Sequence, residues 1–559
     1  MSTKPAKLMS LSRENKVAVL AALLLIFTGW TWGGVVLWTQ WVVFGLGGLS
    51  LAIALAPESR TTLLSASPSR TAHLALGLGL MFAAAFIWHD LDRLHDERKS
   101  TLELIPDATF EPLGFGQWGF RGLIVGIGTS LAVLIVAGLL RQSDVRRRLL
   151  RFPPFWLGLI LFIWIACQAL NSWGLIVQRD FVWKLVPQSH VGWLPSGVAA
   201  PFDSTEEPGG MNGWRQLLIL AGPWSLLCAL RAAVLRRRVY AWLAGVAIVT
   251  GLGVALVGNM SRAEKWRDFL GFAVTELKQP PFGPFVYKNH AAAWLYLVLA
   301  LALALMFYLA KRRGDRVDRG GPHLLVAGAA VLLALGSAST MSFGGSVVAL
   351  LLLLLIAPAA YLLDAQLRQN LSPVPAIAMV VLGAIVAYAG LLSADAQRWR
   401  WKFEKKQAAM ERTGEDDRAP LRRVAWAMVT SSTNERQLSG WGAGSFRWVS
   451  PAYMAKEQAF LNKNGVLVRR TSHTHNDWLQ AIVEWGVMGW LACICVAIFL
   501  FYRIRRACVQ LRAPSLALIG GTVLFACHAW YDFLLFQPQM VLLAVIIPWL
   551  IVSEHDDAA

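Results

Sequence analysis

The chain has 559 residues, of which 56% are hydrophobic and only 15% are Asp, Glu, Lys or Arg. Soluble domains carry roughly 25% charged residues, so this composition excludes an ordinary soluble protein. The formal net charge is +18, but the basic residues lie largely in short loops between apolar segments, where they orient a membrane protein and attract anionic lipid. We therefore expect the lipid bilayer, and no nucleic acid, as a partner.

Fourteen apolar segments approach the roughly 20 residues that a helix needs to cross a bilayer. In chain order they are 17–31, 35–56, 71–89, 119–140, 154–177, 213–233, 239–258, 290–310, 323–340, 344–363, 374–393, 478–502, 514–534 and 538–553. The first follows a basic stretch and has no small-residue cleavage site, which predicts an uncleaved helix. The sequence thus predicts an all-α polytopic membrane protein with about 14 transmembrane helices.

Short loops rich in Lys and Arg predict the orientation of these helices, because such loops stay in the cytoplasm. With 14 spans and a cytoplasmic N-terminus, the basic loops all fall on the cytoplasmic side, as does the C-terminus. The segment between the eleventh and twelfth spans then becomes one large periplasmic loop. The predicted organisation is N-terminal helices in 1–258, central helices in 259–393, the loop in 394–477 and C-terminal helices in 478–559.

The predicted periplasmic loop is rich in basic residues, which could meet a membrane-held anion. Around 398–418 acidic residues alternate with the basic ones, and this part favours a solvated charged helix. Beyond it, 422–428 has the pattern of a short amphipathic helix, and 440–446 forms a glycine-rich turn. The glycine run follows no predicted strand, so it is not a nucleotide-binding fingerprint.

The loop ends in a histidine motif that enters the next apolar segment. Asn476 is a good N-cap, so His475 is expected at the mouth of a helix whose N-terminus favours anions. A histidine there can act as a general base near neutral pH. Other interpretations stay open: His473 and His475 as unreactive interfacial residues or as part of a zinc site, and Asp477 or Glu484 as the base.

Four sequence blocks resemble, in the same order, motifs of the O-antigen ligase and polymerase superfamily. FGPFVYKNHA at 282–291 resembles G-P-F-V-N-R-N-H-x-A; RRVAW at 422–426 with GWGAGSF at 440–446 resembles R-x-x-x-W…G-x-G-x-G-x-F; HTHNDWLQ at 473–480 with EWGVMG at 484–489 resembles H-x-H-N-x-x-L-Q…E-x-G-x-x-G; DF at 532–533 with QP at 537–538 resembles the segment between the last two spans. One block alone is a weak signal, whereas four in the right order are a strong one.

The resemblance covers roughly 280–540. The sequence departs from the family in two motifs and in its fourteen predicted spans, which exceed the dozen or so usual in the ligases. Lys288 stands where the family usually has arginine, which keeps the charge but loses the bidentate fork. The segment 342–345 lacks the arginine of the family's S-R-G-G. These departures concern the substrate more than the class of reaction.

The resemblance implies a GT-C-like membrane glycosyltransferase at the periplasmic face of the bacterial inner membrane. Its donor would be a polyprenyl-diphosphate-linked glycan, transferred by inversion without a cofactor or metal. An O-antigen ligase, which transfers to lipid A–core, is placed first; a polymerase would transfer to another glycan and an O-oligosaccharyltransferase to a protein hydroxyl. The non-enzyme alternative is a lipid-linked oligosaccharide flippase, which needs cationic residues within its spans; the segments from 290 to 393 are almost free of charge.

The expected site residues fall into three groups. The catalytic group is His475, as the base, with His473 and Asn476. The cations expected to bind the diphosphate are Arg422, Arg423, Lys288, Arg469 and Arg470. The residues expected to shape the site or contact the substrate are Asn289, His290, Gly440, Gly442 and Gly444.

Overall fold

The computed structural model describes part of the chain, and some of the fourteen predicted spans lie outside the described residues. The described residues are 12–31, 37–56, 135–136, 143–179, 182–200, 212–233, 237–264, 268–269, 272–273, 281–313, 321–370, parts of 400–416, 418–431, 433–468, 470–510, 512–544 and 546. The predicted spans 71–89 and 374–393, and nearly all of 119–140, lie outside these residues.

Seven helices among the described residues are long and apolar enough to cross a membrane. They are α2 (Leu37–Leu55), α6 (Pro153–Leu170), α7 (Gly213–Ala233), α8 (Arg237–Ala263), α9 (Lys288–Arg313), α10 (Pro322–Ser339) and a continuous helix made of α11 (Phe343–Leu351), a π-helical turn (Leu352–Ile356) and α12 (Ala357–Leu363). Three further helices fall on predicted spans: α1 (Arg13–Trp30), α20 (Val487–Gln510) and α21 (Ala513–Ala529). The protein is therefore mostly helical and has the character of a polytopic membrane protein.

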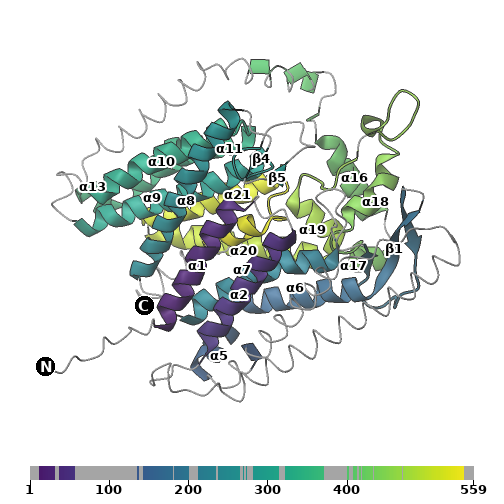
Figure 1. The fold of residues 1–559 in the computed structure, drawn as a ribbon, viewed down its shortest axis with the longest axis horizontal. Helices are drawn as coiled ribbons and strands as arrows, with labels where there is room; N and C mark the ends of the chain where they lie inside the picture. The colour runs from purple at the N-terminus through teal and green to yellow at the C-terminus, as the bar shows by residue number, and fades with distance from the viewer. Residues whose placement is uncertain are drawn as a thin grey trace.

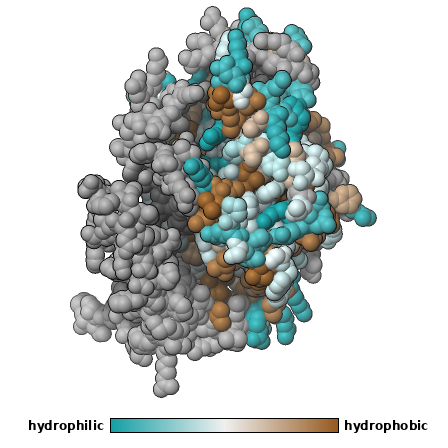
Figure 2. Space-filling view, turned by 90° about the vertical axis from the view of Figure 1, so that its right-hand side faces the viewer, coloured by the Kyte–Doolittle hydropathy of each residue, from teal (hydrophilic) through white to brown (hydrophobic). Residues whose placement is uncertain are grey.

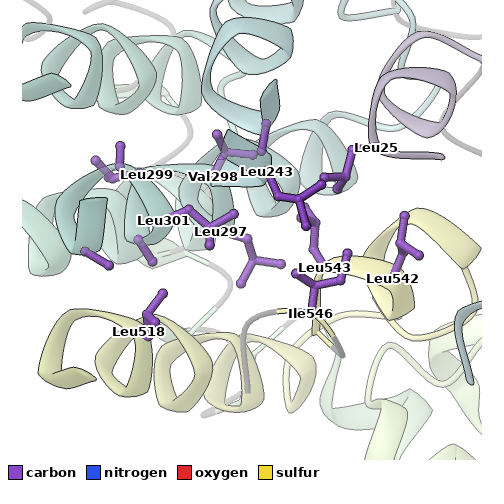
Figure 3. Packing of buried hydrophobic residues seen from close by; sticks show 14 of the residues in the cluster. Leu25, Leu243, Leu297, Val298, Leu299, Leu301, Leu518, Leu542, Leu543 and Ile546 are labelled. Carbon is purple, nitrogen blue, oxygen red and sulfur yellow. The ribbon is translucent and has the colours of Figure 1, made fainter. Parts of the chain in front are cut away.

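Helix α9 lies at the centre of the bundle, where it packs against α8, α10 and α21. Between 291 and 310 its sequence is mostly Leu and Ala, which are strong helix formers, and it is apolar on every side. Every residue from Ala291 to Leu303 is at most 2% exposed. Figure 3 shows leucines of α9 lying between Leu243 of α8 and Leu518 of α21.

Helices α16 (Ala419–Thr430), α17 (Asn434–Ser439), α18 (Phe446–Met454) and α19 (Asp477–Trp485) gather at one end of the bundle. They share a second, separate core with a small sheet, through residues such as Val424, Phe446 and Ile176. We call these four helices and that sheet the cap. In Figure 1 the cap lies at the right, whereas α5 (Ser143–Leu150) and α13 (Ala365–Asn370) lie away from it. Figure 2 looks onto the cap end, where hydrophilic side chains alternate with apolar patches.

The sheet of the cap corrects the prediction of an all-α chain. Strand β1 (Ser172–Arg179) pairs antiparallel with β2 (Val182–Pro187) and parallel with β3 (Gly197–Ala199). The predicted span 154–177 was therefore too long, because α6 ends at Leu170. The Trp, Leu, Ile and Val that follow are apolar enough for a membrane, but such residues also favour strands. A second, two-stranded sheet joins β4 (Asp268–Phe269) to β5 (Phe272–Ala273).

The predicted span 478–502 is also two helices rather than one. Gly486 has φ of +58° and separates amphipathic α19, which belongs to the cap, from apolar α20. A Cβ on Gly486 would lie 2.4 Å from the backbone nitrogen of Gly440, so only glycine allows this close crossing. The apolar, membrane-like part of this segment thus begins at Val487, beyond the acidic residues of α19.

Candidate active site

The histidine motif adopts the local structure that the sequence predicts. Helix α19 begins at Asp477, and the Asn476 side chain caps it by accepting a hydrogen bond from the Leu479 N–H at 3.0 Å. His475 directly precedes the N-cap residue Asn476 and has φ of +53°. Non-glycine residues rarely adopt this left-handed conformation, and it persists where surrounding contacts enforce it. His475 is therefore held in an unusual position at the mouth of the helix.

Asp532 is the residue that holds His475. The Nδ1 atom of His475 lies 3.2 Å from a carboxylate oxygen of Asp532. The other oxygen accepts a hydrogen bond from the Asn289 amide and lies 3.5 Å from the Arg418 guanidinium. Burial alone would raise the pKa of Asp532, but the hydrogen bond from His475 and the charge of Arg418 hold this pKa well below its usual range. Asp532 is thus a buried, ionised carboxylate.

The ionised Asp532 determines the tautomer of His475. Because the carboxylate can only accept hydrogen bonds, the Nδ1 atom must carry the proton that it donates. The Nε2 atom is then available as a proton acceptor, and among the described residues it has no hydrogen-bond partner. A carboxylate, an imidazole and an open imidazole nitrogen form the geometry of a general base.

His473 has a different environment from that of His475. Its ring stacks on Phe533, with centroids 4.3 Å apart and an interplanar angle of 6°, and its Nδ1 atom meets the Gln480 amide at 3.3 Å. Burial, together with the neighbouring His475 and His290, lowers the pKa of His473 to about 3. A neutral, stacked imidazole of this kind is a poor proton acceptor near neutral pH. The geometry therefore favours His475 over His473 as the base.

Phe533 also brings the 282–291 block into the site. Its ring stacks on Tyr287 with centroids 5.1 Å apart, and its carbonyl oxygen lies 2.9 Å from the Nε2 atom of His290. Lys288 is the first residue of α9, next to Asn289, which bonds Asp532. Three blocks that are far apart in the sequence thus meet around Asp532 and Phe533.

The two carboxylates that the sequence left as alternative bases have structural partners. Asp477 accepts hydrogen bonds from the backbone N–H groups of Leu534 and Leu535 at 2.7 and 2.9 Å. Glu484 accepts hydrogen bonds from the Gly444 backbone at 2.9 Å and from the side chain of Gln480 at 3.0 Å. Both carboxylates are at most 2% exposed. They hold loops in place and offer little room for a substrate hydroxyl.

The three glycines of the 440–446 turn wrap the end of α19. Gly442 donates its N–H to the carbonyl oxygen of Glu484 at 3.0 Å, and Gly444 donates to the Glu484 side chain. Gly440 has φ of +75°, and a Cβ there would lie 2.4 Å from the Glu484 carbonyl oxygen. The glycines therefore permit close backbone contact, so they shape the turn beside α19. A contact with substrate stays a prediction.

The expected cations that the structure describes differ in their surroundings. Arg422 pairs with Asp416 at 3.0 Å and is 28% exposed; its second terminal nitrogen is buried and has no hydrogen-bond partner among the described residues. Arg423 is 45% exposed and pairs with both Glu415 and Glu457. Arg470 lies in an exposed segment, and Arg469 lies outside the described residues. Arg422 thus has donor capacity left for an anion, whereas the acidic partners of Arg423 occupy it.

Sequence reasoning gave no role to two residues that the structure places in the site. The charge pattern of 398–418 predicts a solvated helix, whereas the structure places Arg418 beside Asp532. Asp532 belongs to the block at 532–538, whose resemblance implies no role for it. The available signal was Asp532 itself, an acidic residue inside the predicted span 514–534, where such a residue is costly unless it has a partner. No local signal indicated Arg418.

The part of the chain that the structure describes has no group of three or more His, Cys, Asp or Glu side chains placed to hold a metal ion. His473 and His475 do not share a common ligand position in these contacts, because one side chain stacks on Phe533 and the other bonds Asp532.

The apolar helices indicate a multi-pass membrane protein, and half-buried His475 with buried Asp532 forms a polar site where the cap meets the bundle. Residues 323–494 match the family model described as O-antigen ligase. This match confirms the resemblance inferred from the four blocks. The blocks at 282–291 and 532–538 lie outside the matched residues, yet they complete the site. No curated protein matches the chain.

Proposed function

We propose that this protein transfers a glycan from a polyprenyl-diphosphate donor to an acceptor hydroxyl at the periplasmic face of the inner membrane. The observation that carries the proposal is the contact between His475 and ionised Asp532, 3.2 Å apart, with an open imidazole nitrogen. This arrangement suits a reaction that must remove a proton from a weakly acidic hydroxyl group.

In the proposed reaction the acceptor oxygen attacks the anomeric carbon of the donor glycan, and its proton moves to the Nε2 atom of His475. The bond between the anomeric carbon and the diphosphate oxygen breaks, and the electron pair leaves with the polyprenyl diphosphate. Direct attack on the face opposite the leaving group inverts the anomeric centre. The reaction needs only groups that the chain supplies.

The leaving diphosphate gains negative charge as the bond breaks, so cations beside it lower the barrier. Arg422 is the first candidate, because one of its terminal nitrogens is buried without a partner among the described residues. A guanidinium binds phosphate oxygens in a bidentate manner, which suits this role. Lys288 at the start of α9 is the second candidate, since it lies beside Asn289.

We place the cap in the periplasm and both termini in the cytoplasm. Helix α5, which carries Arg146, Arg147 and Arg148, lies away from the cap, as does the Lys311 end of α9. Short basic segments at that side fit the rule that such loops stay in the cytoplasm. The lipid-linked donor would then meet the cap at the outer interface.

For the acceptor we place lipid A–core first, which makes the protein an O-antigen ligase. The description of the matched family supports this choice. A polymerase would use another lipid-linked glycan in its place, and an O-oligosaccharyltransferase would use a protein hydroxyl. These reactions share the chemistry at His475 and differ only in the hydroxyl that is deprotonated.

Glycan transfer in proteoliposomes tests the proposal. Purified protein is given a lipid-linked oligosaccharide donor and, separately, lipid A–core, a second lipid-linked glycan or a serine-containing protein. We expect product with the wild type and a loss of roughly 10²–10⁴-fold with His475→Ala. Asn464→Ala, an exposed turn residue of the cap region, is the matched control and should keep its activity.

The acceptor that is consumed identifies the reaction. Full transfer activity of His475→Ala would show that His475 is not the general base. Translocation of the lipid-linked donor across the bilayer without any glycan transfer would show that the protein is a flippase and not an enzyme.

A further inference from the structure

A cavity of about 200 Å³ lies where α16, α17, the glycine turn, α19 and α20 meet. Apolar side chains of α16 and α19 line it, together with Thr430, Gln437, Trp441, Trp490 and Arg436. None of these residues contacts His475 or Asp532 through a described bond. The cavity is therefore separate from the proposed catalytic group.

The two tryptophans offer aromatic surface to a ligand. The indole of Trp441 is fixed, because its Nε1 atom donates to the Met428 carbonyl oxygen at 3.0 Å and its ring packs against Trp173 at 5.7 Å. Trp490 is 44% exposed on α20. Aromatic faces next to neutral hydroxyl and amide groups, here Thr430 and Gln437, suit a ligand with apolar ring faces and many hydroxyl groups. That is the chemistry of a sugar.

The charge of the cavity disfavours an anionic ligand such as a phospholipid headgroup. Arg436 lines the cavity, and its guanidinium donates to the Ser196 hydroxyl at 2.7 Å and lies 3.8 Å from the Glu435 carboxylate. It also stacks over the Trp173 ring at 4.4 Å. Its charge is thus balanced by a carboxylate, and no other cation lines the cavity among the described residues. A neutral carbohydrate fits this balance better than a phosphate does.

The size of the cavity limits what it can hold. Pockets for drug-sized ligands enclose about 300–1,000 Å³, so this smaller cavity takes one ring rather than a whole oligosaccharide. The occupant is therefore one sugar of a longer glycan, whose remainder extends out of the cavity.

One face of α16 connects the cavity to the expected diphosphate site. Arg422, Trp426 and Thr430 follow each other at intervals of four residues, so they lie on one side of the helix. Trp426 is 50% exposed, and the Thr430 hydroxyl donates to its carbonyl oxygen at 3.0 Å. Eight residues of helix span about 12 Å. A glycan whose diphosphate lies at Arg422 could thus follow this face and reach the cavity.

We infer that the cavity is a carbohydrate subsite, which holds one sugar ring of the glycan at a distance from the reacting bond. Its assignment to the donor glycan rests on the proposed function, because it uses Arg422 as the diphosphate site. An acceptor glycan would offer the same chemistry, and kinetics separate the two sources.

The test uses full-length protein in phosphatidylcholine nanodiscs and the oligosaccharide released from the lipid-linked donor by mild acid, labelled with fluorescein. Fluorescence polarisation should show saturable binding to the wild type. Trp490→Ala and Gln437→Ala should each weaken this binding by roughly fivefold to tenfold, the loss of one stacking contact or hydrogen bond. The matched control is Ile494→Ala, which lies one turn further along α20, is 49% exposed and does not line the cavity.

Steady-state transfer then assigns the source of the sugar. A rise in the KM of the lipid-linked donor in Trp490→Ala assigns the ring to the donor, and a rise in the KM of the acceptor assigns it to the acceptor; either outcome supports a carbohydrate subsite. Binding needs no catalysis, so a wild type that binds the oligosaccharide but transfers nothing would overturn only the proposed function.

Two results would overturn the inference. The first is binding that Trp490→Ala and Gln437→Ala leave unchanged, or no saturable binding by the wild type. The second is displacement of the oligosaccharide by dihexanoyl phosphatidylglycerol in the wild type and not in Trp490→Ala, which would make the cavity a lipid headgroup site.

Discussion

The core around α9 and the network around Asp532 are both buried, but they are held together in different ways. From Ala291 to Leu303 the core consists of close-packed, mostly apolar side chains, each of which contributes through area and fit. Around Asp532 every contact is directional: Asn289, His475 and Arg418 each meet one particular oxygen atom. Apolar cores tolerate exchange of similar side chains, whereas a polar network loses function when one partner is removed.

The largest effect should follow from removing the charge at the centre of this network. Asp532→Asn keeps the shape of the side chain but no longer orients the Nδ1 proton of His475. We expect transfer to fall by roughly 10²-fold or more, because a misoriented base loses most of its contribution. Initial rates in proteoliposomes measure this loss, and a thermal unfolding scan of the same sample checks that the variant is folded.

The pH dependence sharpens this prediction. The pKa of Asp532 is held well below its usual range, so the carboxylate stays ionised from pH 5 to pH 8. The rate of Asp532→Asn should therefore stay well below that of the wild type at every pH in this interval. A ratio of the two rates that approaches one at pH 5 would mean that Asp532 takes up a proton there and that its partners do not stabilise the ionised form.

Two neighbouring arginines on α16 give the next largest contrast. Arg422→Ala should reduce transfer by roughly tenfold to a hundredfold, because it removes a guanidinium with unused donor capacity. Arg423→Ala should reduce it by about twofold at most, since that side chain is already paired with Glu415 and Glu457 at the surface. The comparison is made on kcat/KM for the lipid-linked donor.

Arg422→Lys refines the comparison, because lysine keeps the charge and loses the bidentate fork. It should restore part of the activity that Arg422→Ala loses. Equal losses in Arg422→Ala and Arg423→Ala would show that the two cations act only through the general field of the cap.

The sequence predicted the local structure of this site better than its spatial organisation. Local patterns predict the N-cap at Asn476, the helix over 422–428 and most apolar helices, and the structure contains these features. The pairing of Asp532 with His475 joins residues 57 positions apart. A local sequence pattern does not show which of the loops between spans lie next to each other. Hydrophobic periodicity therefore could not predict the contact between Asp532 and His475.

The errors in the fold have a related cause. The β-branched and aromatic residues of β1 continue the apolar run of α6, so hydropathy alone extended the span beyond Leu170. The break at Gly486 depends on the close approach of Gly440 from another part of the chain. Tertiary contacts decide both features, and a window of neighbouring residues does not contain them.

Glu484 tests whether the glycine turn depends on one buried carboxylate. Burial raises the pKa of Glu484 from 4.5 to about 7, although hydrogen bonds from Gly444, Gln480 and Gln216 act to lower it. Between pH 4.5 and pH 7 the folded protein therefore binds a proton that the unfolded chain has released. Its contribution to stability is full below pH 4.5 and is lost as the pH rises through 7.

Glu484→Gln removes this titration and turns an acceptor into a donor that faces Gly444 or Gln216. We expect a loss of about 1–3 kcal/mol in the free energy of unfolding at pH 5 and a smaller loss at pH 8, because the wild type itself weakens as the pH rises. Unfolding in detergent at the two pH values measures the difference. A deficit that grows with pH would contradict the raised pKa.

The smallest effect should come from the polar contact at the other end of α9. Lys311 lies 2.5 Å from Asp364, whose carboxylate also accepts the backbone N–H groups of Ala513 and Leu367. In Lys311→Ala the carboxylate keeps these two donors, so we expect a loss of about 1 kcal/mol in stability. Transfer should stay within about twofold of the wild type, because Lys311 contacts no residue of the site. A folded Lys311→Ala protein that has lost transfer would instead show that the two ends of α9 are coupled, and the apolar core would then transmit a rearrangement rather than only hold the bundle together.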